Sequence, residues 1–148
     1  REIGFIMLLA GLTQILVQGG LLRILLKIFS EKQLIRSGYA SLILGFLIIP
    51  SSNINLIPVA IILLCYGIGV TGPCINSLIS KASPPHLKGL ALGSAYSSQA
   101  AARFFGQPLA GFIFLHLGKN YHFYFDVVFL LILAFFYFFS NLKHAKTL

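Results

Sequence analysis

The longest uncharged segment of the chain runs from Ser37 to Ser80, and its length restricts the fold more than any other feature. A helix that crosses the ~30 Å hydrocarbon core of a bilayer needs about 20 mostly apolar residues, so this segment is too long for a single crossing. The run from Pro50 to Asn55 divides it, because proline and small polar residues favour a turn. The segment therefore predicts two spans, over about residues 35–49 and 56–80.

Three other apolar stretches predict further spans, over about residues 3–22, 90–117 and 121–140. The composition agrees, because only 9% of the 148 residues are charged, whereas about 25% are charged in a soluble globular domain. The stretches do not alternate apolar and polar residues as the strands of a membrane barrel do. We therefore expect an all-α, polytopic transmembrane helical bundle, which excludes a soluble enzyme and a disulfide scaffold.

The basic residues occur in alternate loops, and this orients the predicted spans. Eight of them follow the first, third or fifth span: Arg23, Lys27, Lys32, Arg36, Lys81, Lys88, Lys143 and Lys146. Arg1 and Lys119 fall on the other side. Because lysine and arginine accumulate on the cytoplasmic side of membrane proteins, we expect these three regions, including the C-terminus, to be cytoplasmic. The partition accounts for most of the net charge of +8, so we expect no nucleic-acid partner.

Three groups of residues resemble the major facilitator superfamily (MFS) of transporters. They are Gln18-Gly19-Gly20-Leu21 with Ser30-Glu31-Lys32-Gln33-Leu34, then Pro73 with Asn76-Ser77-Leu78-Ile79-Ser80 and Lys88-Gly89, and finally the glycine- and proline-rich run from Ala102 to Gly111. They resemble, in order, the connection between the eighth and ninth helices, the tenth helix with its following loop, and the eleventh helix. The resemblance covers nearly the whole chain and is closest to the tetracycline and multidrug proton-antiporter branch.

This resemblance implies a partial MFS fold, in which residues 1–148 form the C-terminal transporter region. The chain would contain helices eight to twelve and would lack the first helix of the C-terminal half. An odd number of spans that starts outside is also typical of the last part of a longer protein. The resemblance implies an integral protein of the bacterial inner membrane, whose partners are the bilayer, the missing N-terminal helices and a small-molecule substrate. It further implies secondary active transport, proton-coupled and directed to drug efflux, without a cofactor. The alternative is a transport-inactive membrane fragment that serves as a structural or interaction subunit.

Arg103 lies near the middle of the predicted fourth span and is the strongest candidate for a functional residue. An arginine at that depth costs on the order of 3 kcal/mol and usually faces a bundle interior or an aqueous cavity. Gln99 and Gln107 lie four residues to either side, so the three side chains form one polar stripe. Two interpretations remain open: contact with substrate or participation in coupling, and a structural pairing with groups on the missing helices.

Two further sets of residues are candidates within the spans. Gln14 and Gln18 are four residues apart on the first span, where they either bind substrate or hydrogen-bond across helices. The third span is interrupted by Gly67, Gly69, Gly72 and Pro73. These residues remove side chains and a backbone donor, which predicts either a flexible helix that lines the transport cavity or a kink that accommodates a neighbour.

The loop after the first span contains Arg23, Lys27, Glu31 and Lys32. The resemblance implies that this loop belongs to a cytoplasmic gate, while the simplest interpretation of Glu31 and Lys32 is a solvated ion pair. The four histidines lack the spacing of metal ligands, and no catalytic serine, histidine and aspartate set is present. We therefore expect no enzymatic activity and no metal site.

Overall fold

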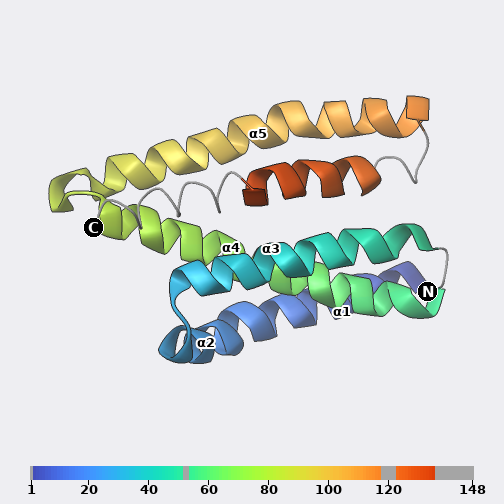
Figure 1. Ribbon diagram of the computed structural model, residues 1–148, viewed down its shortest axis with the longest axis horizontal. Coiled ribbons are helices and arrows are strands. Elements are labelled where there is room, and N and C mark those ends of the chain that lie inside the picture. The colour runs from blue at the N-terminus through green and yellow to red at the C-terminus, as the bar shows by residue number, and fades with distance from the viewer. Residues whose placement is uncertain (1, 52–53, 118–122, 136–148) are drawn as a thin grey trace.

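The structure is a computed structural model that describes residues 2–51, 54–117 and 123–135. Its helices are α1 (Glu2–Leu16), η1 (Val17–Leu21), α2 (Leu22–Ile28), α3 (Glu31–Ile48), η2 (Ile49–Ser51), η3 (Ile54–Leu56), α4 (Ile57–Ala82), η4 (Pro85–Leu87), α5 (Lys88–Leu117) and a last helix, Phe123–Phe135. The described residues contain no strand, which confirms the predicted all-α fold class. Figure 1 shows the long helices running alternately in opposite directions.

Two helices are long and apolar enough to cross a bilayer by length and composition, Gly4–Ile28 and Ile57–Ala82, and Phe123–Phe135 is a shorter apolar helix. The helix α5 extends from Lys88 to Leu117, close to the expected residues 90–117. That all five expected segments cross a membrane stays a prediction. The end of the expected fifth span, residues 136–140, lies outside the described residues.

The first helix continues beyond the expected end of its span, because no helix breaker follows residue 22. It passes without interruption through the π-helical turn η1, where the backbone N–H of Leu22 donates to the carbonyl oxygen of Val17. Arg23 and Lys27 therefore lie on α2 rather than in a loop. The loop predicted between residues 22 and 35 is reduced to Phe29 and Ser30.

Ser30 ends this short connection by capping α3. Its side-chain oxygen accepts a hydrogen bond from the backbone N–H of Gln33 at 3.4 Å, and the side chain of Gln33 accepts one from the backbone N–H of Ser30 at 3.0 Å. This reciprocal capping box satisfies two N–H groups that the first helical turn leaves without partners. It therefore determines where α3 begins after the chain reverses.

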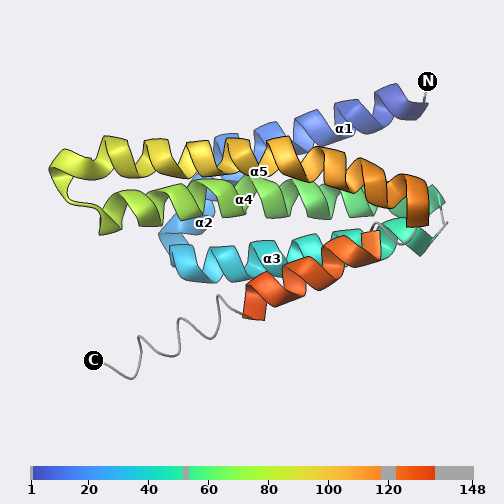
Figure 2. The ribbon, with the colours of Figure 1, turned by 90° about the horizontal axis from the view of Figure 1, so that it is seen from above.

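The helices α3 and α4 form an antiparallel pair whose backbones approach closely at glycine residues (Figures 1 and 2). A Cβ atom at Gly67 would lie 2.5 Å from Leu42 Cγ and 2.8 Å from the carbonyl oxygen of Gly38. One at Gly45 would lie 2.8 Å from Leu64 Cγ. Small residues at such an interface allow the van der Waals packing that holds helices together in a bilayer.

The other side of α4 packs against the first helix. A Cβ atom at Gly69 would lie 2.8 Å from Val17 Cγ1, so here too the contact requires glycine. The buried core follows the same contacts and consists of Val17, Leu22, Leu34, Ile35, Val70 and Cys74. The helix α4 is therefore central, with Gly67 towards α3 and Gly69 towards η1.

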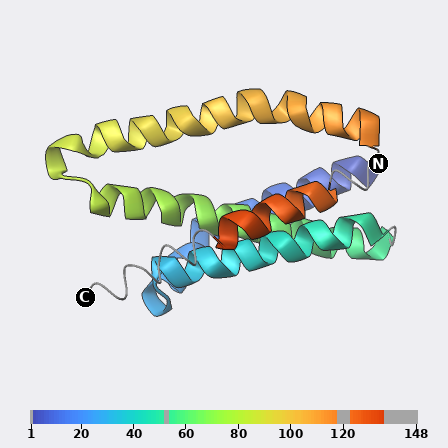
Figure 3. The ribbon, with the colours of Figure 1, turned by 45° about the horizontal axis from the view of Figure 1, so that its top comes forward.

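The helix α5 and the last helix lie outside this core. Figure 3 shows α5 running along one side of the other helices, and its side chains are exposed over most of its length. The last helix is placed against α3 by Phe46 and Phe123, whose ring centroids are 6.5 Å apart. The structure thus consists of a packed core of three helical segments and two more loosely attached helices.

We expect Gly67→Ala to destabilise the protein, because the added methyl group would press the carbonyl oxygen of Gly38. Overpacking of this kind costs about 1–3 kcal/mol, whereas alanine gains only ~1 kcal/mol over glycine in helix propensity. Unfolding by SDS in detergent micelles, followed by far-UV circular dichroism, measures the change. Gly72→Ala is the matched control, since a Cβ atom there would meet nothing within 4 Å. Equal responses of the two variants would contradict the close contact.

Candidate functional site

Basic residues from separate parts of the chain meet at one end of the helices. The end of α2, the start of α3, the end of α4 and the start of α5 all lie at this end, on the left in Figure 1. The residues that they contribute are Arg23, Lys27, Lys32, Arg36, Lys81 and Lys88. We call this the basic end. Lys143 and Lys146, which were expected on the same side, lie outside the described residues.

Glu31 is the acidic residue at the basic end, and its partners are on α4. Its Oε1 atom accepts hydrogen bonds from Ser77 Oγ at 2.6 Å and from Lys81 Nζ at 2.5 Å. The hydrogen bond from Lys81, followed by that from Ser77, lowers the pKa of Glu31 below its ordinary value. The predicted ion pair with Lys32 is therefore wrong, because Glu31 pairs with a lysine fifty residues away in sequence.

The contacts of Glu31 join the start of α3 to the end of α4. A carboxylate in the first turn of a helix also interacts favourably with the helix dipole. The Glu31 side chain is 16% exposed and that of Lys81 is 67% exposed, so water screens the pair from the lysine side. The ion pair thus orients the α3–α4 pair at the basic end without contributing much stability.

A second polar contact links α4 to α5. The side-chain amide of Asn76 donates a hydrogen bond to the hydroxyl of Tyr96 at 3.2 Å. The other amide atom, Asn76 Oδ1, is buried and has no hydrogen-bond partner among the described residues. This contact lies near the end of α4 that also carries Ser77 and Lys81.

The predicted polar stripe on α5 lies on an exposed part of that helix. Gln99, Arg103 and Gln107 are all exposed, and α5 continues unbroken past them despite Pro108. Within the part of the chain that the structure describes, none of the three side chains has a hydrogen-bond or ion-pair partner. The arginine and its neighbouring amides are thus exposed on the surface formed by the described residues.

The two glutamines of the first helix lie apart from this stripe. Gln14 is half-buried and Gln18 is exposed. Figure 1 shows α1 and α5 on opposite sides of the picture, with α4 between them. The sequence candidates on these two helices do not form one site within the described residues.

The residues predicted to make α4 flexible have different surroundings. Gly67 and Gly69 are buried at close helix contacts, whereas a side chain at Gly72 would find open space. Pro73 lies inside a helix that runs without a break from Ile57 to Ala82. A role of these residues in flexibility stays a prediction.

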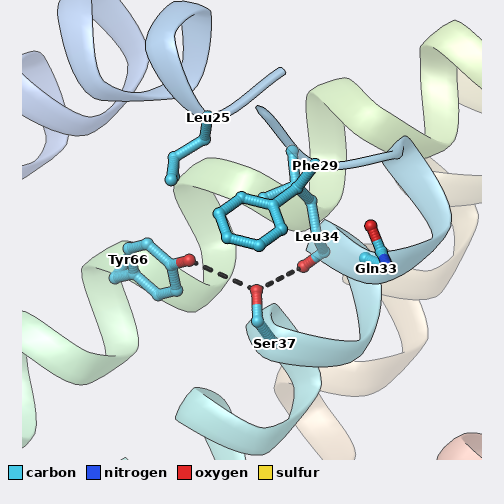
Figure 4. Close-up of a pocket in the computed structure, with 6 residues that line it drawn as sticks. All are labelled: Leu25, Phe29, Gln33, Leu34, Ser37 and Tyr66. Carbon is cyan, nitrogen blue, oxygen red and sulfur yellow. Dashed lines mark hydrogen bonds between the residues drawn. The ribbon is translucent and has the colours of Figure 1, made fainter. Parts of the chain in front are cut away.

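The structure also contains a cavity that the sequence did not predict. It has a volume of about 310 Å³ and lies between the end of α2, the first turns of α3 and Tyr66 in the middle of α4 (Figure 4). We call it the α2–α3 cavity, and it is lined by Leu25, Phe29, Gln33, Leu34, Ser37 and Tyr66. The only available signal was the four-residue spacing of Leu25 with Phe29 and of Gln33 with Ser37, which is too common to identify a cavity.

The hydroxyl of Ser37 organises the polar side of this cavity. It donates to the carbonyl oxygen of Leu34 at 2.9 Å and lies 3.2 Å from the hydroxyl of Tyr66. The remaining walls are mainly apolar. Among the described residues, no group of three or more histidine, cysteine, aspartate or glutamate side chains could hold a metal ion.

We expect the stability of the protein to fall below about pH 4.5, the ordinary pKa of Glu31. A carboxylate whose pKa is lowered by folding contributes stability above its unfolded pKa and loses it as the pH falls through the folded value. Glu31→Gln should remove this part of the pH dependence and cost no more than about 1 kcal/mol at neutral pH, because the pair is partly exposed. Thermal unfolding between pH 3 and pH 7 in micelles, a range that brackets carboxylate titration, measures both effects. Lys32→Gln is the control, and an equal effect of that variant would contradict the pairing with Lys81.

A comparison with protein-family models identifies the chain. The model of the Major Facilitator Superfamily matches residues 1–147. Searches of the curated proteins and of the solved structures found no match. Members of this superfamily are integral membrane proteins that transport small solutes, and they are not enzymes. Because the match covers nearly all of an all-helical, strongly apolar sequence, the chain belongs to the Major Facilitator Superfamily.

Proposed function

We propose that the chain forms the last five helices of a secondary active transporter that moves a small solute by alternating access. In such transporters two halves of the fold rock about a site near the midplane of the membrane. The five helices would then pack against N-terminal helices that complete the fold. The basic end would face the cytoplasm, since lysine and arginine accumulate on that side.

The observation that best supports this function is the exposed position of Arg103. It lies in the interior of a 30-residue helix, one turn from Gln99 and one turn from Gln107. A charged side chain in the middle of a membrane helix is stable only against other protein groups or in an aqueous pathway. In contact with lipid, the guanidinium N–H groups of Arg103 would have no hydrogen-bond acceptors. We therefore propose that Arg103 faces the other half of the transporter and its substrate pathway.

The chemistry of arginine limits what Arg103 contributes. Its guanidinium group stays protonated at all physiological pH values and does not carry a transported proton. It has two available roles, which are to bind an anionic group of the substrate and to lower the pKa of a neighbouring carboxylate. In both roles its positive charge is the property that matters.

Coupling to protons requires a group that titrates during transport. The chain contains three acidic residues, Glu2, Glu31 and Asp126. The hydrogen bonds of Glu31 hold its pKa below the ordinary value, which makes it a poor proton carrier near neutral pH. We therefore propose that the coupling carboxylate lies on the N-terminal helices, within reach of Arg103 in one conformation.

We expect Arg103→Ala to lower the transport rate of the complete protein by about tenfold or more, as the loss of a charged hydrogen-bonding group predicts. Arg103→Lys should retain more activity because it keeps the charge. Efflux of ethidium from cells that produce the protein measures the rate, and the amount of protein in isolated membranes measures insertion. Lys88→Ala, at the start of the same helix, is the control. Wild-type efflux by Arg103→Ala would contradict the proposed role.

If the transporter exports drugs and is coupled to protons, its efflux of ethidium should depend on the proton gradient. A protonophore should abolish ethidium efflux by the wild-type protein while cellular ATP is held constant by an added carbon source. Efflux that persists under these conditions would contradict proton coupling. Absence of ethidium efflux before the protonophore is added would contradict the drug-efflux assignment.

A further inference from the structure

The short helix α2 lies between two places where the backbone can bend. At its start, the π turn η1 contains two adjacent glycines, Gly19 and Gly20. At its end, the backbone of Phe29 is extended, with a φ of −115° and a ψ of 147°, and Ser30 then caps α3. Glycine lets a backbone leave the helical conformation without a steric penalty, and single π turns inside helices are frequent at functional sites. The seven residues of α2 can therefore move as a unit.

Packing among the described residues does not account for the two glycines of η1. Both are exposed, and a Cβ atom at Gly19 or Gly20 would meet nothing within 4 Å. At Gly67 and Gly69, in contrast, close contacts with neighbouring helices require glycine. Two glycines in succession weaken a helix relative to alanine. The pair thus lowers the stability of the first helix where its winding also changes.

The contacts that hold α2 in place are few. Leu22 is its buried residue, Leu25 is half-buried, and the other five residues are exposed. Within the described ranges, no side chain of α2 forms a hydrogen bond or an ion pair. The helix α3, in contrast, buries six residues and is joined to α4 by the ion pair of Glu31 with Lys81. Segments with few buried contacts open most readily, so α2 is less firmly held than α3.

The α2–α3 cavity is the space next to α2. Leu25 and Phe29 form its wall on the side of α2, and Tyr66 of α4 lies across it (Figure 4). Phe29 is 46% exposed although it borders this mainly apolar space of about 310 Å³. Van der Waals packing is what holds helices together in a bilayer. Movement of α2 into this space is therefore favourable, because it would bring two apolar side chains into contact with Tyr66.

We propose that α2 is a strap that alternates between the open position of this structure and a closed position. In the closed position Leu25 and Phe29 pack against Tyr66, and the α2–α3 cavity is filled. The turn η1 is one joint of the strap, and the connection of Phe29 with Ser30 is the other. The stable α3–α4 pair serves as the fixed support against which the strap closes.

The movement would redistribute charge at the basic end. Arg23 and Lys27 belong to α2 and travel with it. Glu31 and Lys81 stay where they are, because their ion pair joins α3 to α4. The movement itself does not depend on transport, whereas its use in alternating access rests on the proposed function.

Distances between two spin labels, measured by pulsed electron paramagnetic resonance, test the movement. The full chain is studied in phosphatidylcholine vesicles, with Cys65 and Cys74 replaced by alanine. One label is attached to Ile24→Cys on α2 and the other to Ala82→Cys at the end of α4, both at exposed positions. We expect two distances for this pair. The reference pair, Ala40→Cys with Ala82→Cys, should give one distance, because α3 and α4 are closely packed. A single distance for the α2 pair, as narrow as that of the reference, would overturn the proposal.

The double variant Gly19→Ala with Gly20→Ala tests the first joint. Alanine has fewer backbone conformations than glycine and favours the helical ones. The population at the closed distance should therefore fall several-fold. Gly11→Ala is the matched control, since Gly11 is an exposed glycine of the same helix whose Cβ atom would also meet nothing within 4 Å. An unchanged distribution in the double variant, or an equal loss with Gly11→Ala, would overturn the proposal.

A cavity-filling variant tests the closed position. Ser37 lines the α2–α3 cavity, so the phenyl group of Ser37→Phe should occupy the space that α2 needs and abolish the closed distance. Ser98→Phe, at an exposed position of α5, is the control and should leave both distances unchanged. Far-UV circular dichroism verifies that each variant is folded. Persistence of both distances in Ser37→Phe would overturn the proposal. Because the distances are measured without transport, their outcome is independent of the efflux assays.

Discussion

The approach of α3 and α4 at Gly38, Gly45 and Gly67 is the contact on which the rest of the structure depends. In a bilayer the lipid tails are as apolar as the helix surfaces, so helices associate through close packing and hydrogen bonds rather than through exclusion of water. Here the backbones pack closely, and Ser41 Oγ donates to the carbonyl oxygen of Leu63 at 2.8 Å across the interface. Once α4 is held in this way, η1 packs against the opposite side of α4. The end of α4 then places Lys81 next to Glu31.

The helical class and the approximate extent of α4 and α5 followed from the sequence, because long uncharged segments have few folds available to them. The sequence did not reveal that α3 packs tightly on α4. Gly38, Ser41 and Gly45 form a line of small residues along one side of α3, within a segment that is otherwise almost entirely apolar. Apolar periodicity does not separate a lipid-facing side from a helix contact, since both are apolar. The size of the side chain was the signal that distinguishes them.

The candidate site was predictable only where it depends on neighbours in sequence. The stripe of Arg103 with its two glutamines follows from helical spacing, and the structure retains it on one exposed helix. The pairing of Glu31 with Lys81 depends on how α3 and α4 come together, and no local rule favours it over the adjacent Lys32. The α2–α3 cavity has the same origin, because Leu25 and Tyr66 become neighbours only through the fold.

The π-helical turn η1 has a consequence for the angular alignment of the first helix. Val17 and Leu22 both belong to the core although they are five residues apart. In a regular α-helix such residues diverge by about 140°, whereas the wider π turn stacks them on one side of the axis. Removal of one residue from Val17–Leu21 would leave Val17 and Leu22 four positions apart, about 40° around a regular α-helix, so α-helical winding would keep Leu22 in the core. The extra residue therefore needs the π turn, because regular α-helical winding of all five residues would turn Leu22 out of the core and Leu25 away from the cavity, and the orientation of the whole basic segment would change with them.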